Sequence, residues 1–218
     1  PLARRILGPT MSRFLVPWRA ASIARQQGRF EQARSYAAES REAAEQAGIG
    51  GSRSTWALWA IREAALIARD VGNLDQAHDI LKDAQRRIED VDNVSLGPSL
   101  RAGLLTTRAS VELRQNDPDG AIDDLSEALA ARQSLQHVET VLAIDLVAIA
   151  LAQQGRAEQA ARLFGAVDRE RERTGLVVRT PDRPLRESAI RATRSVLEHD
   201  GDNALAQGRA MALDEATL

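Results

Sequence analysis

A six-residue segment recurs four times along the chain, and this recurrence limits the possible folds more than any other feature of the sequence. The copies begin at positions 28, 72, 116 and 155, so they lie 44, 44 and 39 residues apart, and they read GRFEQA, GNLDQA, NDPDGA and GRAEQA. Glycine, or the asparagine that replaces it, suits the left-handed conformation that ends a helix. The acidic and amide residues that follow favour the start of another helix. Each copy therefore predicts a hinge between two helices, at Gly28, Gly72, Asn116 and Gly155.

Two alanines accompany every hinge. The sixth residue of each copy is alanine, and a second alanine stands seven residues before each hinge, where it would face the first across a helical hairpin. The four pairs are Ala21 and Ala33, Ala65 and Ala77, Ala109 and Ala121, and Ala148 and Ala160. Small side chains at both places would let the paired helices approach closely. One hairpin cannot bury its apolar side alone, so we expect the hairpins to stack.

This spacing of glycine and small residues resembles the tetratricopeptide repeat over roughly residues 11–175. The second helix carries a further small residue at Ser40, Ala84 and Ala128, whereas Val167 departs from the pattern. The consensus positions for tryptophan and tyrosine in the first helix hold other residues in all four copies, and the copies exceed the usual length of about 34 residues. The resemblance implies an all-α solenoid of antiparallel helix hairpins with a C-terminal helical cap.

The composition agrees with this fold class, because alanine, leucine, glutamate, glutamine and arginine dominate the long segments and all favour helices. We expect repeats over residues 1–175 and a loop with C-terminal capping helices over 176–218. The breaks between hairpins are expected at 48–52, at 93–98 and at Ser134. The four predicted hairpins span about 11–47, 53–91, 98–133 and 135–174.

The C-terminal part carries a second resemblance. LAQQGRAEQAARLFGA at 151–166, GRA at 208–210 and LDEA at 213–216 are similar to the end of the repeat region in large bacterial signal-transducing ATPases, many of them LuxR-type transcriptional regulators. This resemblance is strongest over about 140–218. In such proteins an ATPase module precedes the repeats and a helix-turn-helix domain often follows. This sequence contains neither, so the resemblance implies a repeat segment that receives a signal and passes it on.

The overall charge and the residue content argue against several classes of protein. A formal charge of −2 and a pI near 6.0 do not give the basic excess that a nucleic-acid surface needs. Without cysteine the chain forms neither disulfides nor thiolate metal sites. No apolar run approaches the ~18 residues that cross a bilayer, and no signal-peptide pattern is present. We expect a cytoplasmic protein without direct contact to nucleic acid or membrane.

No residue pattern predicts catalysis. His78, His137 and His199 fall on separate elements, without the short spacing of a metal site. Acidic clusters such as Asp123 and Asp124 alternate with arginines, which is typical of solvated helix faces. A carboxylate pair for acid–base chemistry remains an alternative, but no nucleophile or cofactor motif accompanies it. We therefore expect no enzymatic activity, cofactor or metal.

The tetratricopeptide resemblance also implies a binding surface, because the first helix of each hairpin lines the concave side of such arrays. We select its tryptophans, arginines and polar residues, since tryptophan and arginine are frequent at binding hot spots. An alternative for the tryptophans is packing between hairpins, and Trp56 shares a helix face with Trp59, so at least one of these two is expected in the core. The selected residues are Trp18, Ser22, Arg25, Trp59, Arg62, Arg69, Thr106 and Asp145.

The leading hypothesis is a protein-interaction or signal-sensing module of a bacterial transcriptional regulator, which binds a peptide, a protein or a small effector on its concave face. The alternative is a structural spacer or a self-association scaffold without a small ligand.

Overall fold

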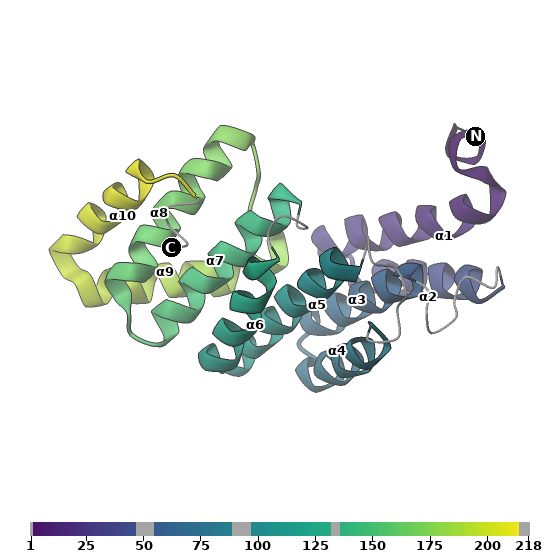
Figure 1. Ribbon diagram of the computed structural model, residues 1–218, viewed down its shortest axis with the longest axis horizontal. Helices are drawn as coiled ribbons and strands as arrows, with labels where there is room; N and C mark the ends of the chain where they lie inside the picture. The colour runs from purple at the N-terminus through teal and green to yellow at the C-terminus, as the bar shows by residue number, and fades with distance from the viewer. Residues whose placement is uncertain (1, 47–54, 89–96, 132–135, 214–218) are drawn as a thin grey trace. The chain divides into compact units, whose positions relative to one another are not determined.

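The computed structural model describes residues 2–46, 55–88, 97–131 and 136–213, and all the regular elements in these ranges are helices (Figure 1). Within these ranges, the side chains of residues 2–11, 44, 45, 55–57, 97 and 199 are not described. The chain packs as two compact units, Pro1–Thr107 and Arg108–Leu218. We call them unit 1 and unit 2.

Unit 1 consists of two helical hairpins and most of a fifth helix, α5, which continues into unit 2. The hairpin partners α1 and α2 pack together, as do α3 and α4, and α2 also contacts α3. The first helix begins at Leu2 rather than near residue 11, because alanine, arginine and leucine among residues 2–7 favour helix as much as the repeat itself does. The helices are α1 (Leu2–Gln26), α2 (Phe30–Gln46), α3 (Thr55–Asp70), α4 (Leu74–Ile88) and α5 (Gly97–Glu112).

Unit 2 continues the series with a third and a fourth hairpin turn and ends in two further helices. Helices α9 and α10 pack on α7 and α8, and they cover the last hairpin. The elements are η1 (Leu113–Gln115), α6 (Pro118–Ala130), α7 (His137–Gln153), α8 (Ala157–Thr174), η3 (Thr180–Asp182), α9 (Arg183–Leu197), η4 (Glu198–Asp200) and α10 (Gly201–Ala210). The predicted division into repeats over 1–175 and a cap over 176–218 stays a prediction.

The four hairpin turns share one backbone conformation. Gly28, Gly72, Asn116 and Gly155 have φ angles of 76°, 86°, 62° and 77°. At the first turn the N–H of Gly28 donates to the oxygen three residues back, and the next N–H donates to the oxygen five residues back, both over 2.9 Å. The same two bonds close the other three turns. This arrangement satisfies the last carbonyls of a helix, and it is the left-handed hinge that the sequence predicts.

The alanine pairs lie in the interior of both units. All eight recurring alanines have an exposed fraction of 0 %. The second alanine of each pair also donates the first N–H bond of its helix, as Ala33 does to the oxygen of Arg29 over 3.0 Å and Ala160 to that of Arg156 over 3.0 Å. Hinge, helix start and close packing thus depend on the same six-residue segment.

Two glycines bring α10 against α8 (Figure 1). A Cβ atom built on Gly208 would lie 2.7 Å from the carbonyl carbon of Arg162, and one built on Gly165 would lie 2.9 Å from the amide nitrogen of Arg209, with the oxygen of Leu205 nearer still. No methyl group fits at either place. The sequence segments that carry the C-terminal resemblance therefore include the two residues at which these helices cross.

Several predictions from the sequence concern residues outside the described ranges. They are the breaks at 48–52, at 93–96 and at Ser134, and the segment 214–216. None of the described helices combines the length and the apolar character needed to cross a membrane.

The substitution Gly208→Ala tests the helix crossing. In an open helix, glycine to alanine stabilises by up to about 1 kcal/mol. Here the added methyl group collides with the backbone of α8, so we expect a loss of about 2 kcal/mol in the free energy of unfolding. Urea denaturation followed by circular dichroism measures it. Gln207→Ala, at an exposed position of the same helix, is the control, and equal effects of the two changes would contradict the close approach.

A candidate binding face on the first helices of unit 1

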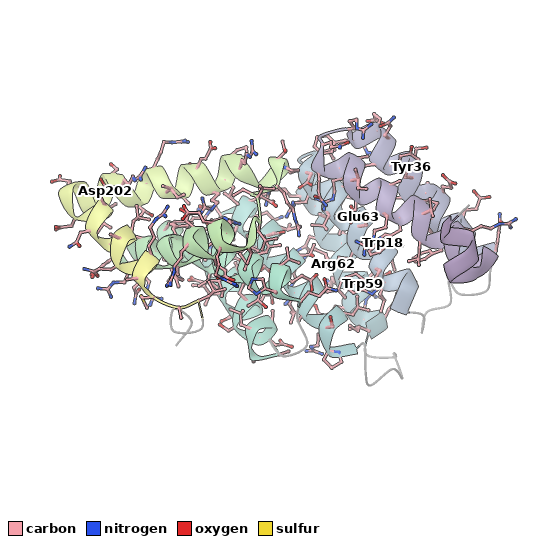
Figure 2. The ribbon with its side chains drawn as sticks, turned by 90° about the horizontal axis from the view of Figure 1, so that it is seen from above. Trp18, Tyr36, Trp59, Arg62, Glu63 and Asp202 are labelled. Carbon is pink, nitrogen blue, oxygen red and sulfur yellow. The ribbon has the colours of Figure 1, made fainter. Side chains whose placement is uncertain are left out.

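Trp18 of α1 and Trp59 of α3 form an aromatic pair. Their ring centroids lie 6.1 Å apart with an angle of 56° between the ring planes (Figure 2), a separation at which aromatic pairs attract. Both side chains are partly exposed. The pair therefore joins the two hairpins and contributes to the surface at the same time. The side chain of Trp56, which the sequence placed on the same helix face, lies outside the described part.

Arg62 extends this pair towards α5. Its guanidinium carbon lies 5.3 Å from the centre of the Trp59 ring, and its Nε donates to Oγ1 of Thr107 over 2.9 Å. The guanidinium also fills the space beside Gly103, where a Cβ atom would lie 3.1 Å from it. Arg62 is only 8 % exposed. It supports the tryptophan pair from within rather than offering a free charge.

Arg19 supplies the exposed cation that the selection from the sequence missed. Its guanidinium carbon lies 4.6 Å from the centre of the Trp18 ring, and its side chain is exposed. Such stacking on an indole is favourable by about 0.5–1 kcal/mol at exposed sites. The tetratricopeptide positions skip this residue, although its place next to Trp18 was a usable signal. We call Trp18, Arg19, Trp59 and Arg62 the tryptophan face.

The indole nitrogen of Trp18 has no hydrogen-bond acceptor among the described residues, and it is shielded from solvent. An unpaired buried donor costs on the order of 1–3 kcal/mol. A rotation of the indole that brought this N–H to an acceptor would recover the cost. The tryptophan face thus contains a polar group that the described residues leave unused.

Arg25 lies in the interior of unit 1 rather than on a binding surface. It is 1 % exposed, and it donates from Nε to Glu63 and from Nη1 to Asp70, each over 2.7 Å. Burial alone would lower the pKa of Arg25, but attraction to Glu63 and Asp70 raises it above its ordinary value. Arg69 shares Asp70, with its Nε 2.7 Å from the carboxylate. Arg25 thus joins α1 to α3, whereas Arg69 pairs within α3, and the binding role expected for these two residues stays a prediction.

Ser22 and Thr106 differ in their access to solvent. Ser22 is partly exposed one turn beyond Trp18, and its hydroxyl accepts a bond from Gln26 over 3.2 Å. Thr106 is buried, and its hydroxyl donates to the oxygen of Ala102 over 2.8 Å. Thr106 is therefore shielded from solvent, and the binding role expected for it stays a prediction. Ser22 stays at the edge of the tryptophan face.

Asp145, the eighth selected residue, lies in unit 2 and joins three helices. It accepts bonds from Arg171 of α8 over 2.9 Å and from Arg186 of α9 over 2.8 Å. Arg186 also donates to Asp168 over 2.6 Å. Burial alone would lower the pKa of Arg186, but Asp145 and Asp168 raise it. The carboxylate of Asp145 thus holds two cations of its own chain, and the binding role expected for it stays a prediction.

The segment after α8 covers this side of α7. Residues 176–179 and Asp182 enclose a cavity of about 30 Å³ together with Leu142 and Asp145, which is room for one or two water molecules. Arg114 fixes the end of the segment by donating to the oxygen of Pro181 and to Asp182, each over 3.0 Å. In unit 2, the segment after α8 thus covers the part of α7 where the tetratricopeptide resemblance implies a binding surface.

A second charged cluster in unit 2 contains an unusual carboxyl group. Burial raises the pKa of Glu112 to about 7, and repulsion by Asp124 adds to this effect, whereas Arg108 opposes it. Arg108 forms its closest ion pair with Asp124, while its Nε lies 3.5 Å from Glu112. The other oxygen of Glu112 is buried without a partner among the described residues. The folded state therefore favours the protonated form of the Glu112 carboxyl group.

Removal of the Arg25 charge should destabilise unit 1 strongly. In Arg25→Met, the carboxylates of Glu63 and Asp70 stay buried after the loss of their cation, and we expect a loss of about 3 kcal/mol in the free energy of unfolding. Arg34→Met is the matched control, because it breaks an exposed pair with Glu31 that contributes below about 1 kcal/mol. Urea denaturation of both variants measures the difference. A loss no larger than that of the control would contradict the buried network.

The raised pKa of Glu112 predicts a loss of stability with rising pH. The unfolded carboxyl titrates near 4.5 and the folded one near 7, so the folded state binds the extra proton between these values. The contribution to stability then falls over this window, by about 3 kcal/mol at most. Glu112→Gln should remove the loss, so the variant should exceed the wild type in stability at pH 8 but not at pH 4. Glu158→Gln, at an exposed position, should behave like the wild type in denaturation at both pH values.

Comparison with known proteins identifies the repeat in the part of the chain that holds the tryptophan face. A family model described as tetratricopeptide repeat matches residues 13–90, which begin in α1 and extend just past α4. No curated protein and no solved structure matches the chain. Tetratricopeptide repeats generally mediate contacts between proteins and are generally scaffolds without catalysis. The chain is thus an all-α protein of helical hairpins, and it contains tetratricopeptide-like repeats.

Proposed function

We propose that unit 1 binds a segment of a partner protein on the tryptophan face. The observation that carries the proposal is the partly exposed pair of Trp18 and Trp59, with the cation of Arg19 stacked at its edge. Tryptophan offers a large contact area at low entropic cost, and such residues dominate binding energies at protein interfaces. The match to tetratricopeptide repeats over residues 13–90 supports a protein as the partner.

The chemistry of the face indicates a segment with apolar and acidic side chains. The two indole rings would take an apolar side chain, and Arg19 would pair with a carboxylate, because arginine forms forked, charge-assisted bonds to such groups. A main-chain carbonyl of the segment could accept the unused N–H of a rotated Trp18 indole. Arg62 is already bonded to Thr107, so it would hold Trp59 in place.

The wider role that we propose is a module of a bacterial transcriptional regulator that senses a signal through this partner. It rests on the resemblance of residues 140–218 to the repeat ends of signal-transducing ATPases of the LuxR type. Unit 2 would then act as a supporting element, since its own residues occupy the side of α7 that could otherwise bind. A self-association scaffold is the alternative, and sedimentation at increasing concentration distinguishes the two, because a constant monomer mass excludes it.

The proposal is tested by peptides selected from a random display library on the immobilised protein. We expect enrichment of sequences with apolar and acidic residues, and a tenfold or greater loss of affinity in Trp18→Ala, about 1.4 kcal/mol. Arg19→Ala should weaken the same peptides through the lost charge without affecting the core. Fluorescence anisotropy measures affinity, and circular dichroism checks helicity. Tyr36→Ala is the control, because this aromatic residue is exposed on α2 (Figure 2). Unchanged binding in both test variants would reject the tryptophan face.

A further inference from the structure

A groove runs along the side of α3 that faces away from Trp59. Helices α2, α3 and α4 surround a cavity of about 700 Å³, a size typical of ligand-binding clefts. Ala60 and Ala64 of α3 line its floor and are partly exposed, and Ala68 continues the same row. Residues four apart lie on one helix face, so the row extends over about 12 Å of α3. Because alanine has little bulk, another backbone can approach α3 closely along this row.

The two walls of the groove differ in charge. Helix α2 contributes Arg34 and Arg41, which lie seven residues apart and hence on one side of the helix. Helix α4 contributes Asp79 and Asp83 on the opposite wall, followed by Arg87. Asp83 is paired with Arg87 over 2.6 Å. Asp79 has no ion-pair partner within the described part of the chain and is exposed, so one carboxylate of this wall is available.

The walls run in the same direction. Trp18 lies beside Trp59, and Arg25, further along α1, reaches Glu63 and Asp70 further along α3, so α1 and α3 are parallel. Since α2 and α4 each return antiparallel to these helices through a tight hinge, they are parallel to each other. A segment that lies in the groove parallel to these helices therefore has the arginines of α2 along one flank and Asp79 along the other.

The geometry points to one amphipathic helix of a partner protein as the occupant of this groove. Its stripe of small apolar residues would lie on the alanine row of α3, its acidic residues would face Arg34 and Arg41, and a basic residue would face Asp79. Such a helix uses the general mode in which an apolar helix face enters a groove. The groove and the tryptophan face lie on opposite sides of α3, so this surface is independent of the proposed function.

Three synthetic helical peptides of equal length test the charge pattern. Each carries the same alanine and leucine stripe, and they differ only in their flanks: glutamate on one and lysine on the other, glutamate on both, or lysine on both. The wild-type protein should bind the mixed peptide about tenfold more tightly than either of the others. Reversal of a helix in the groove exchanges its two flanks. The mixed peptide therefore has one direction in which glutamate faces the arginines and lysine faces Asp79, so the comparison does not require the direction to be known. Fluorescence anisotropy of labelled peptides gives the affinities.

Three variants of the protein complete the test. Asp79→Arg makes both walls basic, so it should prefer the peptide with glutamate on both flanks by about tenfold. Asp75→Arg is the matched control: it makes the same charge change at an exposed position in the first turn of α4 that does not line the groove. Ala64→Leu should weaken the mixed peptide at least tenfold by filling the floor, with helicity unchanged in circular dichroism.

The possible results separate this inference from its alternatives. Equal binding of the three peptides, binding of none of them, or the same response in Asp75→Arg and Asp79→Arg would overturn it. A second copy of the chain would be the occupant if the protein formed a concentration-dependent dimer that Asp79→Arg dissociated and bound no peptide selectively. That result would overturn the inference. Trp18→Ala should leave the affinity for the mixed peptide unchanged, so failure of the groove and failure of the tryptophan face are distinguishable.

Discussion

The left-handed hinge between paired helices is the constraint on which the rest of the structure depends. A helix that ends in this conformation satisfies its last carbonyls within the turn, so the next helix begins two positions after the hinge residue and returns along the first. The alanine in the first turn of the second helix is then carried into the interior of the hairpin, where a larger side chain would separate the pair. The first two turns, closed by the same two hydrogen bonds, belong to the hairpins whose first helices, α1 and α3, contact each other. The tryptophan pair, the buried arginine network and the alanine row of α3 all follow from this arrangement.

The sequence predicted the elements that local interactions determine. Hinges and alanine pairs depend on residues fewer than fifteen positions apart, and the hinge conformation of Gly28 was predicted correctly for this reason. Helix ends were less accurate, as the early start of α1 shows. The candidate site could be predicted only in part. Trp18, Trp59 and Arg62 do come together, but no sequence pattern indicated that Arg62 would be held by Thr107, which lies 45 residues away.

Buried charge explains why the other selected residues could not be placed from the sequence. Arg25 and Arg19 are six positions apart on one helix and look equivalent, yet one is enclosed by two carboxylates from α3 and the other is stacked on the surface. The difference arises from Glu63 and Asp70, whose approach depends on the packing of two hairpins. The carboxylate of Asp145 is likewise paired with one arginine of α8 and one of α9. The groove of α2, α3 and α4 could not be predicted from the sequence, because three helices from two hairpins form it.

The ion pairs of Arg186 connect the repeat pattern to the helices that follow it. The last recognisable repeat ends near Gly175, and the sequence predicts the end of the repeats there. Yet Asp145 and Asp168, inside that boundary, receive part of their counter-charge from beyond it. A protein shortened to its repeats would therefore leave Asp145 with Arg171 alone and Asp168 without the Arg186 cation, and it would also lose the glycine contact between α8 and α10. We therefore expect a segment of unit 2 that folds on its own to include α9 and α10 as well as the repeats.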